Sequence, residues 1–259
     1  MGRIDAIFAH LDGTRPIIPF VVAGDPSLEA TEAIIPALHR AGAPIIEIGI
    51  PFSDPIADGP VIAAAMYRAL ERGVTPNTVL DMVRRLRPTT EAAMVAMVSD
   101  SIVFRLGGEA FVAMLAEAGF DGLIVPDLDS DAAGSIAEAC KHHDLAFTML
   151  IAPTTPPQRL RTLAQQSSGF LYVLARAGLT GERGEGPSGL AERIAAIRSE
   201  TDLPLAVGFG ISTADQVEAV TSLADAAIVG SALVRRLADA AEPVAEAAAM
   251  LDELTPQKG

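Results

Sequence analysis

The chain alternates short apolar runs with longer, alanine-rich segments that carry charges, and this alternation occurs eight times. The apolar runs predicted as strands cover residues 17–22, 44–49, 93–98, 122–125, 146–151, 170–174, 205–207 and 226–229. The segments predicted as helices cover residues 28–40, 61–72, 78–87, 109–118, 131–142, 157–164, 189–199, 213–222 and 231–254. Strands that alternate with helices imply a parallel sheet. Eight such units within 259 residues predict an α/β fold, a single (β/α)8 barrel domain over residues 1–259 with extra short helices.

An open, doubly wound sheet is the alternative architecture. Its glycine-rich phosphate turn usually follows the first strand. Here the glycine turns with that character follow the last two predicted strands, which favours the closed barrel. Half of the residues are hydrophobic, which is ample for a large core.

The charge and cysteine content exclude several classes of partner. A net charge of −14 argues against nucleic acid and against anionic membrane surfaces. Cys140 is the one cysteine, so there is no internal disulfide, which suits the cytoplasm. We find no signal peptide pattern at the start and no apolar run long enough to span a bilayer.

Two glycine turns predict a phosphate site. Gly208-Phe209-Gly210 follows the seventh strand and Gly230-Ser231-Ala232 follows the eighth. In barrels of this kind these two loops form the usual phosphate site, because glycine admits an anion close to the backbone and the next helix offers unpaired N–H groups. Neither turn contains Lys or Arg, so backbone N–H groups must bind the phosphate. One such turn alone would be ordinary turn chemistry; two in adjacent positions favour phosphate.

Glu47 lies inside the second predicted strand. Side chains alternate along a strand, so Ile46, Ile48 and Ile50 share the face expected to contact the helices. Glu47 then points into the barrel, where apolar neighbours should raise its pKa and suit it to acid–base catalysis near neutral pH. The alternative is a buried glutamate that backbone donors satisfy.

The loop that follows this strand adds further acids. Asp58 stands before Gly59-Pro60 at a helix entrance, where it could serve the chemistry or simply cap the helix. Asp54 is equally open: it could serve the chemistry or, as it precedes Pro55, simply fix a turn. Residues 175–187 form a long loop with four glycines, which indicates a lid over the substrate or a disordered connector.

Several chemistries lack the residues they need. The two lysines, Lys141 and Lys258, fall on a helix and in the tail, so neither could form an imine in the barrel mouth. No histidine falls at a strand end, which argues against a His-bound metal. What remains is carboxylate acid–base chemistry on a small phosphorylated compound, without metal or covalent cofactor.

Motifs spread over nearly the whole chain resemble the tryptophan synthase alpha subunit family. They are the segment from Glu47 to Ile62, Ala23-Gly24-Asp25-Pro26, Val125-Pro126-Asp127-Leu128, Ala152-Pro153-Thr154-Thr155-Pro156, Ala175-Arg176-Ala177-Gly178-Leu179-Thr180-Gly181 and Val207-Gly208-Phe209-Gly210-Ile211-Ser212. The resemblance implies a (β/α)8 barrel that cleaves indole-3-glycerol phosphate to indole and glyceraldehyde 3-phosphate.

The same resemblance implies a role for individual residues. Glu47 would be the principal acid–base and Asp58 would stabilise the positively charged indolenine through its ring N–H. Tyr172 would shape the site beside Glu47, and Thr180 would close onto Asp58. The resemblance also implies that Phe20, Met97 and Ile124 surround the indole, although ordinary core packing would explain these three residues equally well. It implies that the phosphate is bound by Gly181, Gly210, Gly230 and Ser231.

The resemblance further implies a partner, a pyridoxal-phosphate beta subunit in an α2β2 complex, which the loop with Asp54 would face. The chain departs from the family pattern at Val22, Ala63, Asp129 and residues 99–101, which bears more on partner coupling than on chemistry. A non-catalytic relative that regulates the beta subunit, a barrel isomerase of an aromatic amino-sugar phosphate, and a stand-alone lyase are the other hypotheses.

Overall fold

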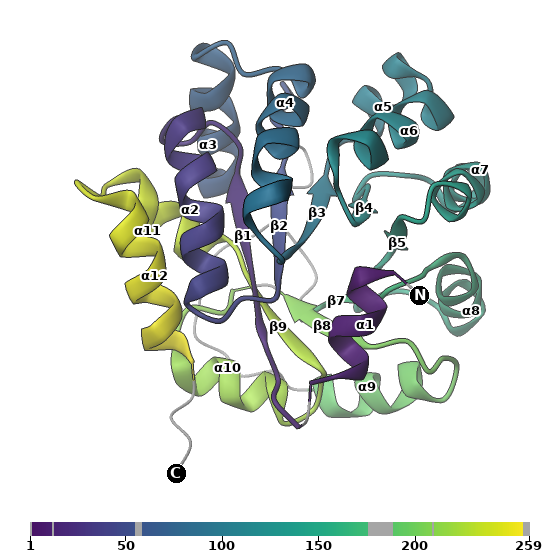
Figure 1. The fold of residues 1–259 in the computed structure, drawn as a ribbon. Helices are drawn as coiled ribbons and strands as arrows, with labels where there is room; N and C mark the ends of the chain where they lie inside the picture. Colours follow the sequence, from purple (N-terminus) through teal and green to yellow (C-terminus); the bar gives the residue numbers. More distant parts are fainter. Residues whose placement is uncertain (1, 12, 55–58, 176–188, 209, 256–259) are drawn as a thin grey trace.

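The computed structural model describes residues 2–11, 13–54, 59–175, 189–208 and 210–255 (Figure 1). The strands are β1 (Ile17–Val22), β2 (Ile45–Gly49), β3 (Ala93–Met97), β4 (Gly122–Ile124), β5 (Ala146–Thr148), β6 (Leu150–Ile151), β7 (Leu171–Leu174), β8 (Leu205–Gly208) and β9 (Ala226–Val229). The helices are α1 (Arg3–Ala9), α2 (Leu28–Arg40), α3 (Pro60–Glu71), α4 (Pro76–Leu86), the 3-10 turn η1 (Arg87–Thr89), α5 (Asp100–Leu106), α6 (Gly108–Ala118), α7 (Ser130–His142), α8 (Pro157–Gln166), α9 (Leu190–Arg198), α10 (Ala214–Thr221), α11 (Ser231–Ala238) and α12 (Pro243–Leu254).

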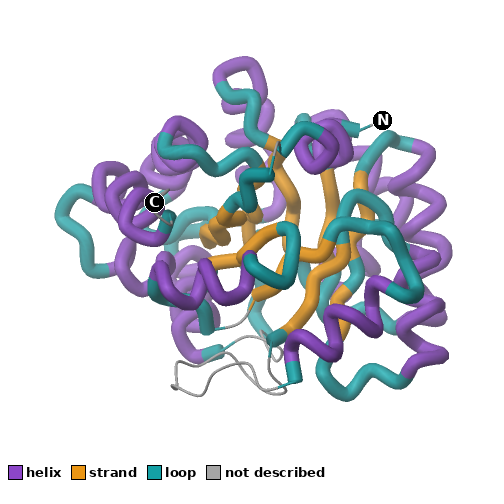
Figure 2. The backbone as a smooth tube through the Cα atoms, turned by 90° about the horizontal axis from the view of Figure 1, so that it is seen from below, coloured by secondary structure: helices purple, strands orange, loops and turns teal. Residues whose placement is uncertain are grey.

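The strands form one parallel sheet that curls into a nearly closed barrel. Its order is β5-β4-β3-β2-β1-β9-β8-β7-β6, and each described pairing is parallel. The two ends of this order, β5 and β6, are consecutive in the chain, so the sheet meets itself. Helices surround the strands (Figure 2). This arrangement confirms the predicted α/β barrel and excludes the alternative, an open doubly wound sheet. None of the helices in the described ranges is long and apolar enough to cross a membrane.

The predicted fifth strand is divided, which corrects its expected extent of residues 146–151. Two serines after α8 take over part of the ladder there. The hydroxyl of Ser168 accepts from the Phe147 N–H at 2.9 Å, and that of Ser167 accepts from the Met149 N–H at 3.3 Å. The Met149 carbonyl then accepts from Tyr172 N–H at 3.1 Å. The seam of the barrel is therefore closed partly by side-chain hydroxyls.

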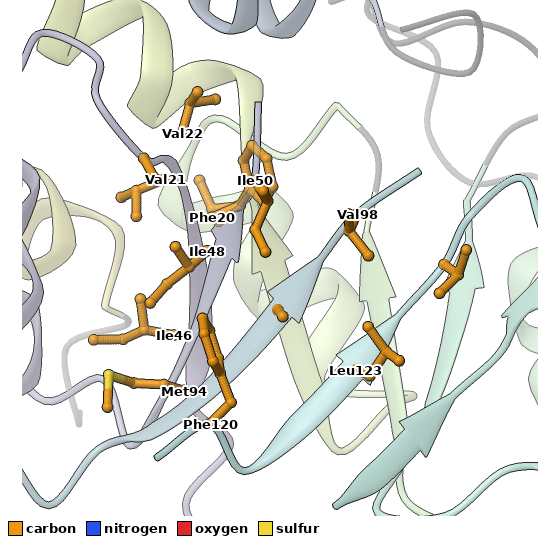
Figure 3. Close-up of a cluster of buried hydrophobic side chains, with 14 of the residues drawn as sticks. Phe20, Val21, Val22, Ile46, Ile48, Ile50, Met94, Val98, Phe120 and Leu123 are labelled. Carbon is orange, nitrogen blue, oxygen red and sulfur yellow. The ribbon is translucent and has the colours of Figure 1, made fainter. Parts of the chain in front are cut away.

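The alternating side chains divide the core into two layers. The side chains of Ile46, Ile48 and Ile50 are on the outer face of the sheet, in the large cluster under the helices that Figure 3 shows with Met94 and Phe120. The residues of the inner cluster fill the barrel: Ile4, Ile18, Ile45, Ala93, Val95, Ile124, Phe170, Tyr172, Ala206, Ala226 and Ile228. The predicted faces of the second strand are thus confirmed.

Helix α1 was absent from the expected elements. It carries Ile4, which is 1% exposed and belongs to the inner cluster although it precedes the first strand. Phe8 on the same helix packs against Phe170, with ring centroids 5.9 Å apart. Helix α1 therefore contributes apolar side chains to the barrel interior from outside the strand–helix repeat.

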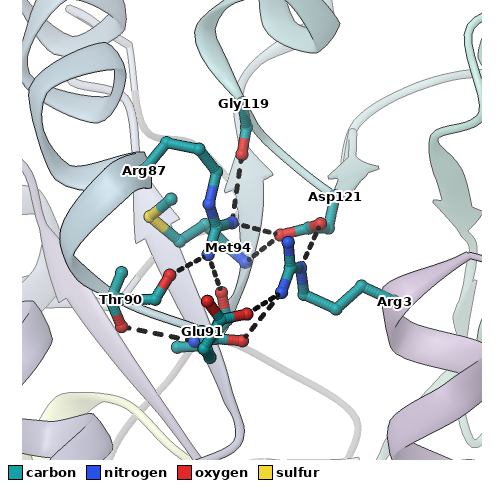
Figure 4. A network of polar contacts seen from close by, with 8 residues as sticks. Arg3, Arg87, Thr90, Glu91, Met94, Gly119 and Asp121 are labelled. Atoms are coloured by element: carbon teal, nitrogen blue, oxygen red, sulfur yellow. Dashed lines mark hydrogen bonds and ion pairs between the residues drawn. The ribbon is translucent and has the colours of Figure 1, made fainter.

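A polar network ties α1 to the amino ends of β3 and β4 (Figure 4). Asp121 accepts from Arg3 Nε at 3.0 Å, from Arg87 Nη1 at 2.9 Å and from the Met94 N–H at 2.8 Å. Arg87 also donates to the carbonyls of Thr90, Ala92 and Gly119. Asp121 therefore neutralises a largely buried guanidinium and fixes where β4 begins.

We expect Asp121→Ala to lower the free energy of unfolding by about 3 kcal/mol, because it leaves Arg87 without its buried counter-charge. Urea unfolding measures this change. Glu91→Ala is the matched control: Glu91 also pairs with Arg3, at 2.7 Å, but its side chain is 86% exposed. That control should change stability by less than about 1 kcal/mol. Equal losses in the two variants would contradict the assignment.

Candidate active site

The strand register brings the predicted site residues to adjacent levels of the barrel. Register partners in a parallel sheet face the same side, and the partners here are Phe20 with Glu47, Met97 with Ile124, and Leu150 with Tyr172. Ile124 and Tyr172 belong to the inner cluster, and Met97 and Leu150 pack against it. Glu47 follows the inner-cluster residue Ile45 by two positions, so it also points inward. Phe20 follows Ile18 by two positions and its ring reaches Gly49, where a Cβ would lie 2.6 Å from the Phe20 Cζ, although Phe20 also packs in the large cluster. All lie toward the carboxyl ends of the strands, where barrel active sites occur.

Glycines on β8 and after β9 complete this ring. A Cβ at Gly208 would lie 2.4 Å from the Tyr172 hydroxyl oxygen, so any side chain there would displace the ring. A Cβ at Gly230 would lie 3.5 Å from the Phe20 Cβ. The aromatic rings of Tyr172 and Phe20 therefore lie against backbone on this side of the mouth, and the glycines leave room that a side chain would fill.

Glu47 is the buried charge-bearing group of the ring. It is 0% exposed, and neither carboxyl oxygen has a hydrogen-bond partner among the described residues. Burial disfavours the charged form and raises the pKa of Glu47 to about 8. The alternative expectation, a glutamate satisfied by backbone donors, does not hold for the described residues. Glu47 is thus a protonated acid at neutral pH that can also act as a base once it has given up its proton.

This raised pKa links Glu47 to stability. In the unfolded chain the carboxyl returns to its ordinary pKa of 4.5, so the folded state binds the proton more tightly. The resulting stabilisation is fully present below pH 4.5 and is lost as the pH rises through about 8. The free energy of unfolding of Glu47→Gln should therefore rise relative to that of the wild type as the pH goes from 5 to 8, by roughly a few kcal/mol. Urea unfolding of both proteins at each pH tests this, and parallel curves would contradict it.

The two predicted phosphate turns differ in how their helices begin. At α10, Thr213 accepts from the Gln216 N–H, and the Gln216 side chain accepts from the N–H groups of Ser212 and Thr213. At α11, Gly230 makes no side-chain cap, and the first helical bond runs from Val234 to Gly230. The first amides of α11 therefore remain available to an anion, whereas at α10 the amides of Ser212, Thr213 and Gln216 are already paired.

An ion pair fixes α3 beside the mouth. Arg68 on α3 donates to Asp25 from Nε at 2.8 Å and from Nη2 at 2.6 Å. The Asp25 side chain is 2% exposed, so the pair is shielded on the acidic side. Met66 of the same helix reaches over β2: a Cβ at Gly49 would lie 3.0 Å from its Cε. The loop after β1 and the helix after β2 thus pack as one unit above Glu47.

A family model described as tryptophan synthase alpha chain matches residues 9–258. The alpha chain of Gloeobacter violaceus is 46% identical over 243 residues, 93% of this chain and 88% of the relative. The alpha chain of Chloroflexus aggregans is 44% identical over 259 residues, 98% of this chain and 97% of the relative. The chain belongs to the tryptophan synthase alpha chain family. A solved tryptophan synthase of Mycobacterium tuberculosis matches its fold with a TM-score of 0.90 at 34% identity, covering 98% of this chain and 96% of that one.

The described site residues of this chain fall into two groups. Phe20, Glu47, Met97, Ile124 and Tyr172 come together in the ring, with Gly230 beside Phe20 and Ser231 as the first residue of α11. Gly210 is exposed, with a φ of +74° that favours glycine. The predicted residues Asp58, Thr180 and Gly181 lie outside the described residues.

Leu150 was missed by sequence reasoning. It follows Thr148 by two positions, so the alternation along the strand could have placed it inside the barrel. The described ranges hold no group of three or more His, Cys, Asp or Glu that could bind a metal ion.

The departures from the family pattern after β3 have a defined structure. Ser99 caps α5 and donates to Asp127 at 2.8 Å, and the Asp100 N–H donates to the same carboxylate at 2.8 Å. Burial and the neighbouring Asp127 raise the pKa of Asp100. These contacts fasten α5 to the end of β4, and α5 presents Phe104 with 85% of its surface exposed.

Proposed function

We propose that the protein cleaves indole-3-glycerol phosphate to indole and glyceraldehyde 3-phosphate, with Glu47 as the proton carrier. The observation that carries this assignment is a fully buried carboxyl whose pKa lies near 8, placed at the carboxyl ends of the strands of a tryptophan synthase alpha chain. A group with such a pKa can both give and take a proton near neutral pH. The lyase activity is that of the family, and the residue roles are the proposal.

The proposed reaction begins with Glu47 protonated. Its proton moves to C3 of the indole ring, and the ring nitrogen takes up the positive charge. The bond between C3 and the glycerol side chain then breaks, and its electron pair returns to the ring to give indole. The adjacent hydroxyl becomes the aldehyde carbonyl as its proton passes to the Glu47 carboxylate. Glu47 ends the cycle protonated, so no other proton source or sink is needed.

The remaining roles follow from the ring and from the resemblance. Phe20, Met97 and Ile124 form the apolar pocket for the indole, with Tyr172 beside it. We assign Asp58 to the ring N–H, as the counter-charge of the protonated intermediate, and Thr180 and Gly181 to closure over it. These three assignments rest on the family pattern.

The phosphate is proposed to bind at α11. The amides after Gly230 are uncapped and the helix dipole favours an anion there. A Cβ at Gly230 would contact Phe20, so an anion at α11 would lie beside the pocket proposed for the indole. Because the start of α10 is capped, we assign Gly210 a lesser role: its turn lets the anion approach, but α10 does not donate its helix amides.

The test of the function is release of indole from indole-3-glycerol phosphate, measured with and without a beta subunit. We expect release by the wild type in both conditions. The absence of release in both would contradict the proposed reaction.

The partner is proposed to be a tryptophan synthase beta subunit in an α2β2 complex, acting in the cytoplasm. Phe104 supports a contact at α5, because a large aromatic side chain with 85% exposure lies beyond the carboxyl end of β3. Asp54, the last described residue before the gap in the loop after β2, is exposed on the same side of the barrel.

Phe104→Ser should weaken binding to a beta subunit by at least about tenfold, since large aromatic side chains often dominate interface energies. Isothermal titration calorimetry of the two subunits measures this. Tyr67→Ser is the matched control, because Tyr67 is 64% exposed but lies on the outer helix α3. Unchanged affinity for Phe104→Ser, or an equal loss for both variants, would contradict the proposed contact.

A further inference from the structure

Thr148 is a second buried polar side chain without a partner in the barrel interior. It ends β5, is 1% exposed, and its hydroxyl has no hydrogen-bond partner among the described residues. Its register partner is Ile124, which belongs to the inner cluster, so Thr148 also points into the barrel. A buried hydroxyl that makes no hydrogen bond destabilises the fold. Neither the proposed reaction nor the fold uses this hydroxyl.

The register places Thr148 close to the level of Glu47. The row through Glu47 passes Val95 on β3 and Gly122 on β4 and reaches Ala146 on β5. In an eight-stranded barrel with a shear of eight, such a row descends toward the amino ends by about one residue per strand. Over the three steps from β2 to β5 the row descends by about three residues, so Ala146 lies about three residues below Glu47. Thr148 is two residues further toward the carboxyl end and therefore lies about one residue below Glu47.

The walls between these two residues are apolar or already assigned. By the same descent, Ile18, Val95 and Ala206 share the level of Thr148, and none has a polar side chain. Phe20 and Met97, which flank Glu47 from β1 and β3, are also apolar. Tyr172 is the other titratable side chain that points into the interior from the described strands. Both unpaired groups therefore point into the apolar interior, from β2 and from β5, which is three strands away in the sheet.

We propose that Thr148 is a positioning residue for Glu47, joined to it by one water molecule enclosed in the barrel. The two side chains make no direct bond, and a buried water needs two to four polar partners, which the carboxyl and the hydroxyl together supply. The water donates to the carboxylate, and the Thr148 hydroxyl holds the water. This deepens the proposed function, because it rests on Glu47 as the proton carrier.

The bridge has a directional effect on the acid. Hydrogen bonds to an ionised group are about twice as strong as those to a neutral one, so the water stabilises the carboxylate more than the acid. Glu47 is thereby kept able to release its proton inside an apolar barrel. Removing the hydroxyl should raise the pKa of Glu47 further and slow the proton transfer without changing how the substrate binds.

The experiment compares Thr148→Val, which replaces the hydroxyl by a methyl group, with Thr148→Ser, which keeps it. The pKa of Glu47 is read from the carboxyl resonance in a 13C NMR titration of the whole protein, assigned with Glu47→Gln. We expect Thr148→Val to raise this pKa by about one unit, equal to a tenfold weaker ionisation. Its kcat should fall severalfold with KM unchanged. Thr148→Ser should keep the wild-type pKa.

Two further variants keep the proposal open to refutation. Thr148→Ala removes the hydroxyl in a smaller side chain and substitutes for Thr148→Val if that variant does not fold. Thr221→Val is the matched control, because Thr221 is also buried but donates to Val217 on α10. An unchanged Glu47 pKa in the variants without the hydroxyl, or an equal shift in Thr148→Ser, overturns the proposal. Full lyase activity in Glu47→Gln would instead overturn the role of Glu47, and the NMR titration would still decide the bridge.

Discussion

Glu47→Gln should lower kcat for indole release by about a thousandfold, with KM changed by less than about threefold. Glutamine keeps the shape of the side chain but can neither give its proton to C3 nor take one from the glycerol hydroxyl. The amide also remains neutral, so the apolar interior around it need not rearrange. Steady-state kinetics of indole release, with the beta subunit present at saturation, measures both constants.

Glu91→Gln is the control for this variant, since Glu91 lies on the surface at the opposite end of the barrel and should retain wild-type kinetics. A thermal melt of each protein confirms that the fold is intact. If Glu47→Gln releases indole as fast as the wild type, another group carries the proton and the proposed mechanism is wrong. A rise in KM without loss of kcat would assign Glu47 to binding alone.

The second large effect is expected at the start of α11. Ser231→Asp should raise KM for the phosphorylated substrate by about ten- to a hundredfold, because the new carboxylate repels the phosphate and competes for the same amides. A carboxylate in the first turn also interacts favourably with the positive end of the helix dipole, so the variant should not lose stability. Lost affinity could then not be attributed to unfolding.

Two controls sharpen this prediction. Ser231→Ala keeps the amides free and should change KM by less than about threefold. Ala214→Asp places the same charge at the first residue of α10, where Thr213 already caps the Gln216 amide and the Gln216 side chain already pairs with the Ser212 and Thr213 amides, so it should have a smaller effect. Steady-state kinetics decides between them. If Ala214→Asp raises KM as much as Ser231→Asp, both helices bind the phosphate and the assignment to α11 alone is wrong.

The predictable part of the fold was the part governed by short-range periodicity. The two-residue alternation in β2 was enough to orient Glu47 inward, and eight repeats were enough to choose the closed barrel. The division of the fifth strand depends on the hydroxyls of Ser167 and Ser168, which lie about twenty residues away in the chain. No local pattern could have indicated that contact.

The site was predictable to a similar degree and for similar reasons. Glycine turns after the last two strands located the phosphate region, but both turns looked equivalent. The difference between them comes from the capping pair Thr213 and Gln216, a signal that was present in the sequence and was not used. The ring around Glu47 required the strand register, which places Leu150 beside Tyr172 and cannot be read from one strand at a time.

The proposed phosphate anchor at α11 consists of main-chain amides, and this affects how the protein can change over generations. A site made of lysines or arginines can be lost through any one of many single codon changes. Amides persist through nearly every replacement, so few substitutions at Ser231 or its neighbours would remove them. Recognition of the phosphate should therefore be robust to mutation, whereas the apolar pocket beside it can diversify. New substrates for this barrel should differ in the ring and keep the phosphate.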